Sequence, residues 1–191
     1  RAEGQEGSRG RGEIEKGVFT QAFHKRRDSI CNRRIEKIKD LIDSSDSLLD
    51  IGAGGGTFLN KVKGKIKTIE ATEVSDVCTA NLKKYGYKTY HGAFNDLTID
   101  KQFDLVTCWH VLEHIEDLEG FVKKATQVTE KYLIIEVPVN RNLRNPDKNF
   151  DGHFHYFSNK SLQLLFANDF EVEYLGEGVQ MPCLLMILKK K

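Results

Sequence analysis

A glycine-rich turn directly after an apolar segment is the feature that most constrains the fold of this chain. The apolar segment Ser47–Ile51 runs into residues 52–56, which read Gly-Ala-Gly-Gly-Gly, and helical character begins at Thr57. Glycine permits positive φ and lets the backbone approach a ligand without hindrance from a Cβ atom. A strand, a glycine turn and a helix in this order are typical of open α/β sheets, which bind nucleotide-like ligands at this edge.

Segments with strand and helix character alternate along the rest of the chain. The expected strands cover residues 47–51, 66–74, 89–91, 103–108, 132–137, 170–175 and 183–188. The expected helices cover residues 57–62, 75–84, 118–126 and 161–167. This alternation predicts an α/β fold with a mainly parallel, seven-stranded sheet and helices on both faces. Only a short glycine-containing segment separates the last two strands, so we expect them to pair antiparallel at the edge of the sheet.

The first 45 residues precede this alternating pattern. Residues 1–17 are rich in Gly, Glu and Arg and are expected to form a disordered arm. Residues 18–45 are expected to form a helical cap with a break near Asp28 and Ser29, and residues 46–191 a single domain. One face of the cap is basic and either is solvated or contacts a carboxylate of a substrate or cofactor. Its residues are Lys25, Arg26, Arg27, Arg33 and Arg34.

The composition of the chain narrows the binding partners and the cellular compartment that we expect. The chain has 29 Lys and Arg against 28 Asp and Glu, so its overall charge does not favour nucleic acid or an anionic membrane. The four cysteines form no C-x-x-C pair, which argues against a disulfide scaffold and favours a reducing compartment, the cytoplasm. No apolar run approaches the roughly 20 residues that a membrane span requires.

The glycine turn discriminates between classes of nucleotide-binding motif. A P-loop requires Lys followed by Ser or Thr, and a dinucleotide-binding turn requires glycine where Thr57 stands. The pattern D-x-G-x-G-x-G is matched by Asp50, Gly52, Gly54 and Gly56. An acid beside the turn repels a pyrophosphate but can accept hydrogen bonds from an ammonium group. Phosphate-bearing cofactors, as in a dehydrogenase, remain the alternative.

On this motif the sequence resembles the class I S-adenosylmethionine-dependent methyltransferases, over about residues 30–190. Residues 103–106 (Phe-Asp-Leu-Val) and 111–114 (Val-Leu-Glu-His) resemble the branch containing ubiquinone-pathway O-methyltransferases and small-metabolite or sugar methyltransferases. The resemblance implies a Rossmann-like fold and S-adenosyl-L-methionine as cofactor. A second acid, Glu73, ends the second expected strand, where a carboxylate can bind both ribose hydroxyls.

The resemblance also implies the rest of the cofactor site. Val74 would pack on the adenine with Phe94 and Asn95 near its edge, and residues 108–110 would line the methionine end. Relatives often place Asp where this chain has Ala93, so the contact to the adenine amine falls to Asn95 or to the backbone. The expected cofactor-binding set is Asp50, Gly52, Ala53, Gly54, Gly56, Glu73, Val74, Phe94, Asn95, Cys108, Trp109 and His110.

Histidines and an acid gather after the fourth expected strand. His110, Glu113 and His114 project to one side if the segment is helical, and His153 follows the fifth strand, where the chain is expected to return over the same edge. These four residues are the expected catalytic set and candidate ligands of a divalent metal (Mg, Mn or Zn). A metal would lower the pKa of a bound hydroxyl. Two alternatives remain: a metal-free site with one histidine as general base, and purely structural histidines.

The acceptor is expected to be a small hydroxylated molecule. Residues 136–140 and 153–158 resemble methyltransferases of sugars and other small metabolites, which implies O-methylation of a small-molecule or glycan hydroxyl. The histidine cluster also resembles small-RNA 2′-O-methyltransferases with E-x-x-E-H, although His110 stands where that family has Glu. One alternative is therefore RNA 2′-O-methylation, with phosphates held by Arg141, Arg144 and Lys148. Another is a non-catalytic cofactor-binding subunit.

Overall fold

The computed structural model describes residues 21–139, 152–179 and 182–191. The expected arm at residues 1–17 and the basic residues Arg141, Arg144 and Lys148 lie outside these ranges. None of the described helices is long and apolar enough to cross a membrane.

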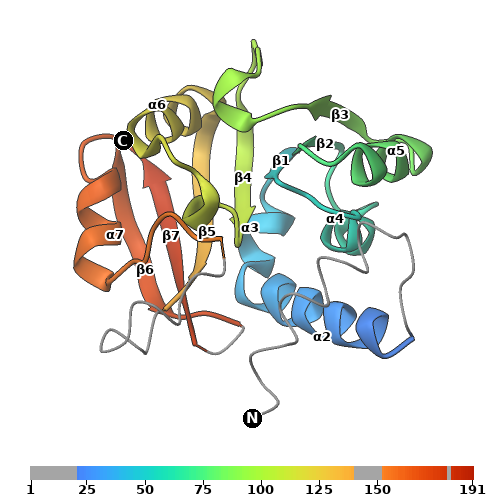
Figure 1. The fold of residues 1–191 in the computed structure, drawn as a ribbon, viewed down its shortest axis with the longest axis horizontal. Coiled ribbons are helices and arrows are strands. Elements are labelled where there is room, and N and C mark those ends of the chain that lie inside the picture. Colours follow the sequence, from blue (N-terminus) through green and yellow to red (C-terminus); the bar gives the residue numbers. More distant parts are fainter. Residues whose placement is uncertain (1–20, 140–151, 180–181) are drawn as a thin grey trace.

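One seven-stranded sheet organises the described residues (Figure 1), with strand order β3-β2-β1-β4-β5-β7-β6. The strands are β1 Ser47–Ile51, β2 Thr68–Glu73, β3 Lys88–His91, β4 Phe103–Trp109, β5 Thr129–Pro138, β6 Phe170–Glu177 and β7 Cys183–Lys190. The first five strands are parallel, and β7 pairs antiparallel with both β5 and β6. The predicted Rossmann-like α/β fold with an antiparallel edge hairpin is confirmed.

The described helices are α2 Gln21–Lys37, α3 Lys39–Asp43, α4 Thr57–Val62, α5 Asp76–Lys84, α6 Leu118–Val128 and α7 Asn159–Phe166, with two 3₁₀ turns, η2 Phe94–Asp96 and η3 Leu112–His114. Three of these helices, α5, α6 and α7, begin at a side-chain cap. The Ser75 side chain caps α5, Asp117 caps α6, and Ser158 forms a capping box with Ser161 at α7.

Side chains of alternate residues in the central strands pack into two different apolar cores. Leu49 of β1 and Val106 of β4 belong to the core that includes residues of α6 and α7. Leu48 and Leu105 belong to the core that includes residues of α2, α4 and α5. Because side chains alternate across a strand, the two cores lie on opposite faces of the sheet. By the same alternation, Asp50 of β1 points toward the α2 face.

The N-terminal helix differs from the expectation in one respect. The predicted break near Asp28 and Ser29 is wrong: α2 continues through both residues, which are exposed and so cost the helix little. The break occurs at Ile38, whose φ of −125° and ψ of 17° end the helical conformation before α3. The short α3 then buries Ile42 completely under the sheet's α2 face.

Candidate functional site

The glycine turn follows β1 at the carboxyl edge of the sheet. Gly52, Gly54 and Gly56 have φ values of 67°, 55° and 79°, in the left-handed region that favours glycine. The Gly52 N–H donates to Thr72 Oγ1 at 3.2 Å, and a Cβ added at Gly52 would lie 2.5 Å from Val111 Cγ2. Glycine is therefore required here by both conformation and space, and the resulting turn lets a ligand approach the backbone closely.

Glu73 ends β2 beside this turn, and backbone N–H groups hold its carboxylate. Oε2 accepts from Gly54 at 2.7 Å, and Oε1 accepts from Val74 at 3.0 Å and from Ser75 at 2.9 Å. Each carboxylate oxygen has two lone pairs, so Glu73 retains capacity at Oε2 to accept one further hydrogen bond from a hydroxyl group. The adjacent Val74 side chain is 66% exposed and offers an apolar surface next to that carboxylate.

Asp50 lies beneath the turn. Its side chain is buried, and its Oδ1 accepts a hydrogen bond of 2.7 Å from the Thr107 hydroxyl on β4. Burial raises the pKa of Asp50 to about 7, although the Thr107 hydrogen bond and the charge of Arg34 act in the opposite direction. In the structure the Asp50 carboxyl contacts Thr107 on β4, and its expected contact with a ligand ammonium remains a prediction.

Most of the other residues that we expected to bind the cofactor are buried at this edge of the sheet. Ala53, Phe94, Cys108 and Trp109 are all buried. Phe94 packs against Phe121 with ring centroids 5.3 Å apart, and burial raises the pKa of the Cys108 thiol well above its usual value. The Cys108 side chain is fully enclosed in the apolar core, and the expected lining of the methionine end by residues 108–110 remains a prediction.

The side-chain amide of Asn95 has an unpaired acceptor oxygen near the carboxyl edge of the sheet. Its Nδ2 donates to the backbone oxygen of Asp117 at 3.0 Å. Its buried Oδ1 has no hydrogen-bond partner among the residues that the structure describes. A buried amide oxygen without a partner is costly, so this atom is suited to accept a hydrogen bond from a ligand amine.

A buried ion-pair network that we did not predict joins α2 to the same edge. Glu136 of β5 is fully buried, and its Oε1 accepts from Arg34 Nε at 3.0 Å and from Arg34 Nη2. Its Oε2 accepts from the Val179 N–H at 2.6 Å. Although burial disfavours the charged form, hydrogen bonds from His110 and the Arg34 charge lower the pKa of Glu136 to about 2. A lone acid in the apolar run of β5 was the available sequence signal.

His110 belongs to this network. It has a φ of 59°, and it is the one non-glycine residue with positive φ in the described ranges. Burial lowers the pKa of His110, but hydrogen bonds to Cys183, Glu113 and Glu136 together raise it to about 11. The group of neighbouring ligand atoms in the described part of the chain consists of Glu113, His114 and His153 and does not include His110. The expected roles of His110 as general base or metal ligand remain predictions.

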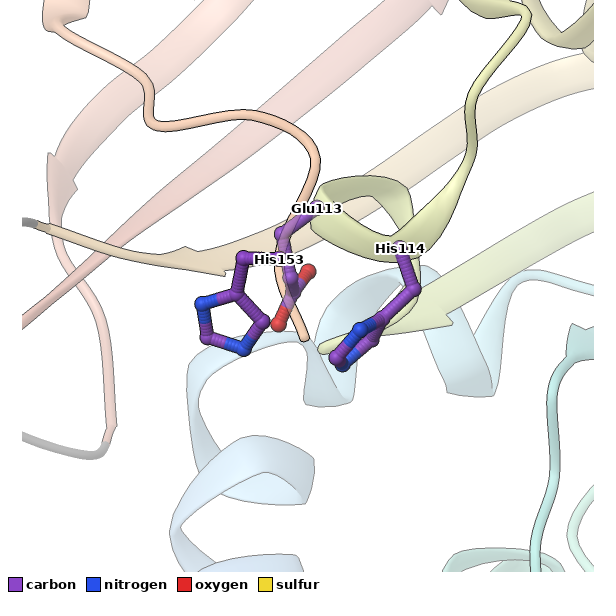
Figure 2. Close-up of side chains that lie close together, drawn as sticks. All are labelled: Glu113, His114 and His153. Carbon is purple, nitrogen blue, oxygen red and sulfur yellow. The ribbon is translucent and has the colours of Figure 1, made fainter. Parts of the chain in front are cut away.

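Three of the four expected catalytic residues come together. Glu113, His114 and His153 each place one potential ligand atom within 4.8 Å of the others. Figure 2 shows Glu113 and His114 on the η3 turn and His153 on the segment that passes over it, with the three side chains pointing toward one another. The rings of His114 and His153 have centroids 4.6 Å apart. We refer to these three residues as the trio.

Backbone contacts hold the trio in place. The Glu113 carbonyl accepts hydrogen bonds from the N–H groups of Phe154 at 2.8 Å and His155 at 3.2 Å, which fixes the returning segment on η3. His114 Nδ1 lies 2.9 Å from the Gly152 carbonyl and must donate to it, so Nε2 carries the lone pair. Buried Glu113 Oε2 has no hydrogen-bond partner among the described residues. Two imidazoles and an unsatisfied carboxylate oxygen fit a divalent cation.

Comparison with known proteins identifies related sequences. A family model described as a methyltransferase domain matches residues 23–175. The ubiquinone biosynthesis O-methyltransferase of Rickettsia bellii is 32% identical over 119 residues, which cover 58% of this chain and 50% of that protein. The chain therefore spans about half the length of this curated relative.

Solved structures share the fold. The magnesium protoporphyrin IX methyltransferase of Synechocystis with bound S-adenosylhomocysteine has a TM-score of 0.69 at 11% identity, covering 86% of this chain and 84% of that one. An S-adenosylmethionine-dependent methyltransferase of Thermotoga maritima has a TM-score of 0.66 at 22% identity, covering 88% and 91%. At these identities the likeness concerns the fold alone.

Proposed function

The chain belongs to the methyltransferase-domain family, and we propose that it transfers the methyl group of S-adenosyl-L-methionine to a hydroxyl group of a small molecule or glycan. One observation carries this proposal: the trio of Glu113, His114 and His153 lies at the same carboxyl edge of the sheet as the glycine turn. A methyl donor bound at the turn would then lie next to residues that can orient and deprotonate a hydroxyl.

The residues at the turn fit this cofactor. Glu73 Oε2 has acceptor capacity for a ribose hydroxyl, and the exposed Val74 side chain can pack on the adenine ring. The unsatisfied Oδ1 of Asn95 can accept from the adenine amine. Arg27 of α2 places Nη2 3.4 Å from where a Cβ on Gly54 would stand, so a cation lies over the turn to meet the methionine carboxylate.

The trio supplies the acceptor side of the proposal. A divalent ion held by Glu113, His114 and His153 would lower the pKa of an acceptor hydroxyl. The chain's own residues orient that site: the Gly152 carbonyl fixes the His114 tautomer, and the 152–158 segment covers η3. Without a metal, the Nε2 lone pair of His114 can take the hydroxyl proton directly.

The cofactor proposal is tested by ligand-dependent thermal stability. We expect S-adenosylhomocysteine to raise the Tm of the full chain and NAD to leave it unchanged. Glu73→Gln should weaken S-adenosylhomocysteine binding by about 1–3 kcal/mol, because a donor then replaces one acceptor oxygen. Glu70→Gln is the matched control, since Glu70 lies on the same strand but pairs with Tyr90 and Lys101. Stabilisation by NAD alone would refute the proposal.

The metal-assisted route is tested by calorimetric titration with Mn²⁺. We expect the chain to bind Mn²⁺, and His114→Ala to abolish binding, whereas His91→Ala on β3 should leave it intact. A chelator should then remove turnover on hydroxylated acceptors. Full turnover in the presence of the chelator would instead assign proton removal to His114 without a metal. If the chain binds the cofactor but methylates no hydroxylated acceptor and no RNA end, a non-catalytic subunit is favoured.

A further inference from the structure

Four side chains form an unbroken path from helix α2 to the trio. Arg34 Nε donates to Glu136 Oε1 at 3.0 Å, and His110 Nε2 lies 3.2 Å from the same oxygen. On its other side, His110 Nδ1 lies 3.4 Å from Glu113 Oε1. The imidazole of His110 thus bridges two buried carboxylates, one in the core of the sheet and one in the trio.

Both ends of this bridge are fixed. The backbone N–H of His110 donates to the Glu136 carbonyl at 2.8 Å, so His110 is attached to Glu136 through backbone and side chain. The Val179 N–H holds the second oxygen of Glu136, and a Cβ added at Gly178 would lie only 3.0 Å from that oxygen. The surroundings therefore leave the Glu136 carboxylate little freedom to move.

The backbone of His110 supports a dedicated role for its side chain. Its φ of 59° is unfavourable for a residue with a Cβ. Such conformations persist where the surrounding structure determines them, and they gather at functional sites. In an ordinary helical turn, His110 would lie on the same face as His114; the left-handed conformation instead directs its ring between Glu136 and Glu113.

We propose that His110 is a positioning residue that orients the Glu113 carboxylate for a divalent ion in the trio, and that Arg34 acts on the same ion through Glu136 and His110. His110 engages Oε1 of Glu113, whereas Oε2 has no hydrogen-bond partner in the described part of the chain. This inference rests on the proposed function, because it takes the trio as a metal site. Residues that orient metal ligands typically change metal affinity by about 10–100-fold.

The test titrates the full chain with Co²⁺, whose visible absorption spectrum reports the ligands around the ion. We expect His110→Asn to weaken Co²⁺ binding by about 10–100-fold without changing the spectrum of the bound ion. Asparagine tolerates positive φ but is too short to reach both carboxylates. Arg34→Lys, which loses the two-pronged contact with Glu136, should weaken binding in the same direction. Arg33→Met, an exposed neighbour on α2, is the matched control and should bind as the wild type does.

The outcomes separate this inference from the proposed function. Equal Co²⁺ affinity in the wild type and His110→Asn overturns the positioning role and leaves the metal site standing. A changed spectrum in His110→Asn makes His110 a direct ligand and also overturns it. If the wild-type chain binds no Co²⁺, both the metal-assisted route and the positioning role are refuted. The cofactor proposal is tested separately, by S-adenosylhomocysteine binding. Cooperative melting of each variant establishes that it is folded.

Discussion

Two buried carboxyl groups at the same sheet edge differ sharply in their surroundings. Asp50 at the end of β1 and Glu136 near the end of β5 are both almost fully buried. Their pKa values move in opposite directions, to about 7 for Asp50 and to about 2 for Glu136. Burial disfavours the charged form in both cases, so the difference comes from their partners.

The partners explain the opposite signs. Glu136 accepts hydrogen bonds from the Arg34 guanidinium, from the His110 ring and from the Val179 N–H. Asp50 accepts one hydrogen bond, from the neutral Thr107 hydroxyl, and Arg34 acts on it only through its charge. A buried carboxylate with charged donors stays ionised, whereas one with a single neutral donor holds its proton more tightly.

This contrast divides the edge into two halves that differ in how their polar groups are paired. The half around the turn consists of glycines in the left-handed conformation and one buried acid, Glu73. The half around η3 is organised by fixed charges, from Arg34 through Glu136 and His110 to Glu113. Under the proposed function, the cofactor would bind at the first half and an acceptor that must lose a proton would bind at the second.

Removing the charge of Glu136 should produce the largest effect. Glu136→Gln leaves the Arg34 guanidinium buried without its counter-ion, and we expect a loss of about 3–5 kcal/mol in the free energy of unfolding at neutral pH. Urea denaturation measures this loss. Glu130→Gln, an exposed site on the same strand, should change stability by less than about 0.5 kcal/mol. Similar small changes in both variants would show that the network contributes little.

Neutralising Asp50 should have the opposite sign and depend on pH. The pKa of Asp50 is about 7 in the folded chain against an ordinary value of 3.8, so the folded state binds more protons between these limits. Wild-type stability therefore falls as pH rises from about 4 to about 7, by up to about 4 kcal/mol from this group. An amide side chain cannot ionise, so Asp50→Asn should gain stability relative to the wild type over the same range.

Denaturant unfolding at pH 4, 5.5 and 7.5 measures this difference. Asp100→Asn, at an exposed position, serves as control and should show no such trend. A constant difference between Asp50→Asn and the wild type would mean that Asp50 is ionised throughout, and the two halves would then not differ as described. Glu136 behaves oppositely: its contribution is present above about pH 4.5 and is lost as pH falls toward its folded pKa of about 2.

Sequence patterns predict the parts of this edge that depend on neighbours in the chain. The bounds of β1 and α4 agree with the expected ranges 47–51 and 57–62, because an apolar run, glycines and a helix start follow one another directly. Helix α5 likewise begins within the expected range 75–84, with Ser75 as its N-cap. Glu113, His114 and His153 meet as expected, since strand order brings the ends of β4 and β5 together.

Features that depend on contacts between residues far apart in the sequence cannot be predicted from local sequence patterns. Arg34 and Glu136 are 102 positions apart, and each alone is typical of a solvated basic face or a strand end. The expected helical turn at residues 110–114 assumed an ordinary backbone, whereas His110 is left-handed and a 3₁₀ turn follows. The burial of Asp50 and its pairing with Thr107 on β4 also cannot be read from its position next to the turn.

A pair of glycine substitutions tests whether the turn after β1 requires glycine at position 52. This prediction has the smallest expected effect. Gly52→Ala would force a Cβ into a φ of 67° and to 2.5 Å from Val111 Cγ2, so we expect a loss of about 1–3 kcal/mol in stability. Gly55→Ala is the matched control, since a Cβ there meets no atom within 4 Å. Denaturation and S-adenosylhomocysteine titration should both distinguish the two variants. Because Val111 follows His110 directly, displacement of Val111 should also weaken Mn²⁺ binding in Gly52→Ala; unchanged Mn²⁺ affinity would show that the two halves of the edge are mechanically independent.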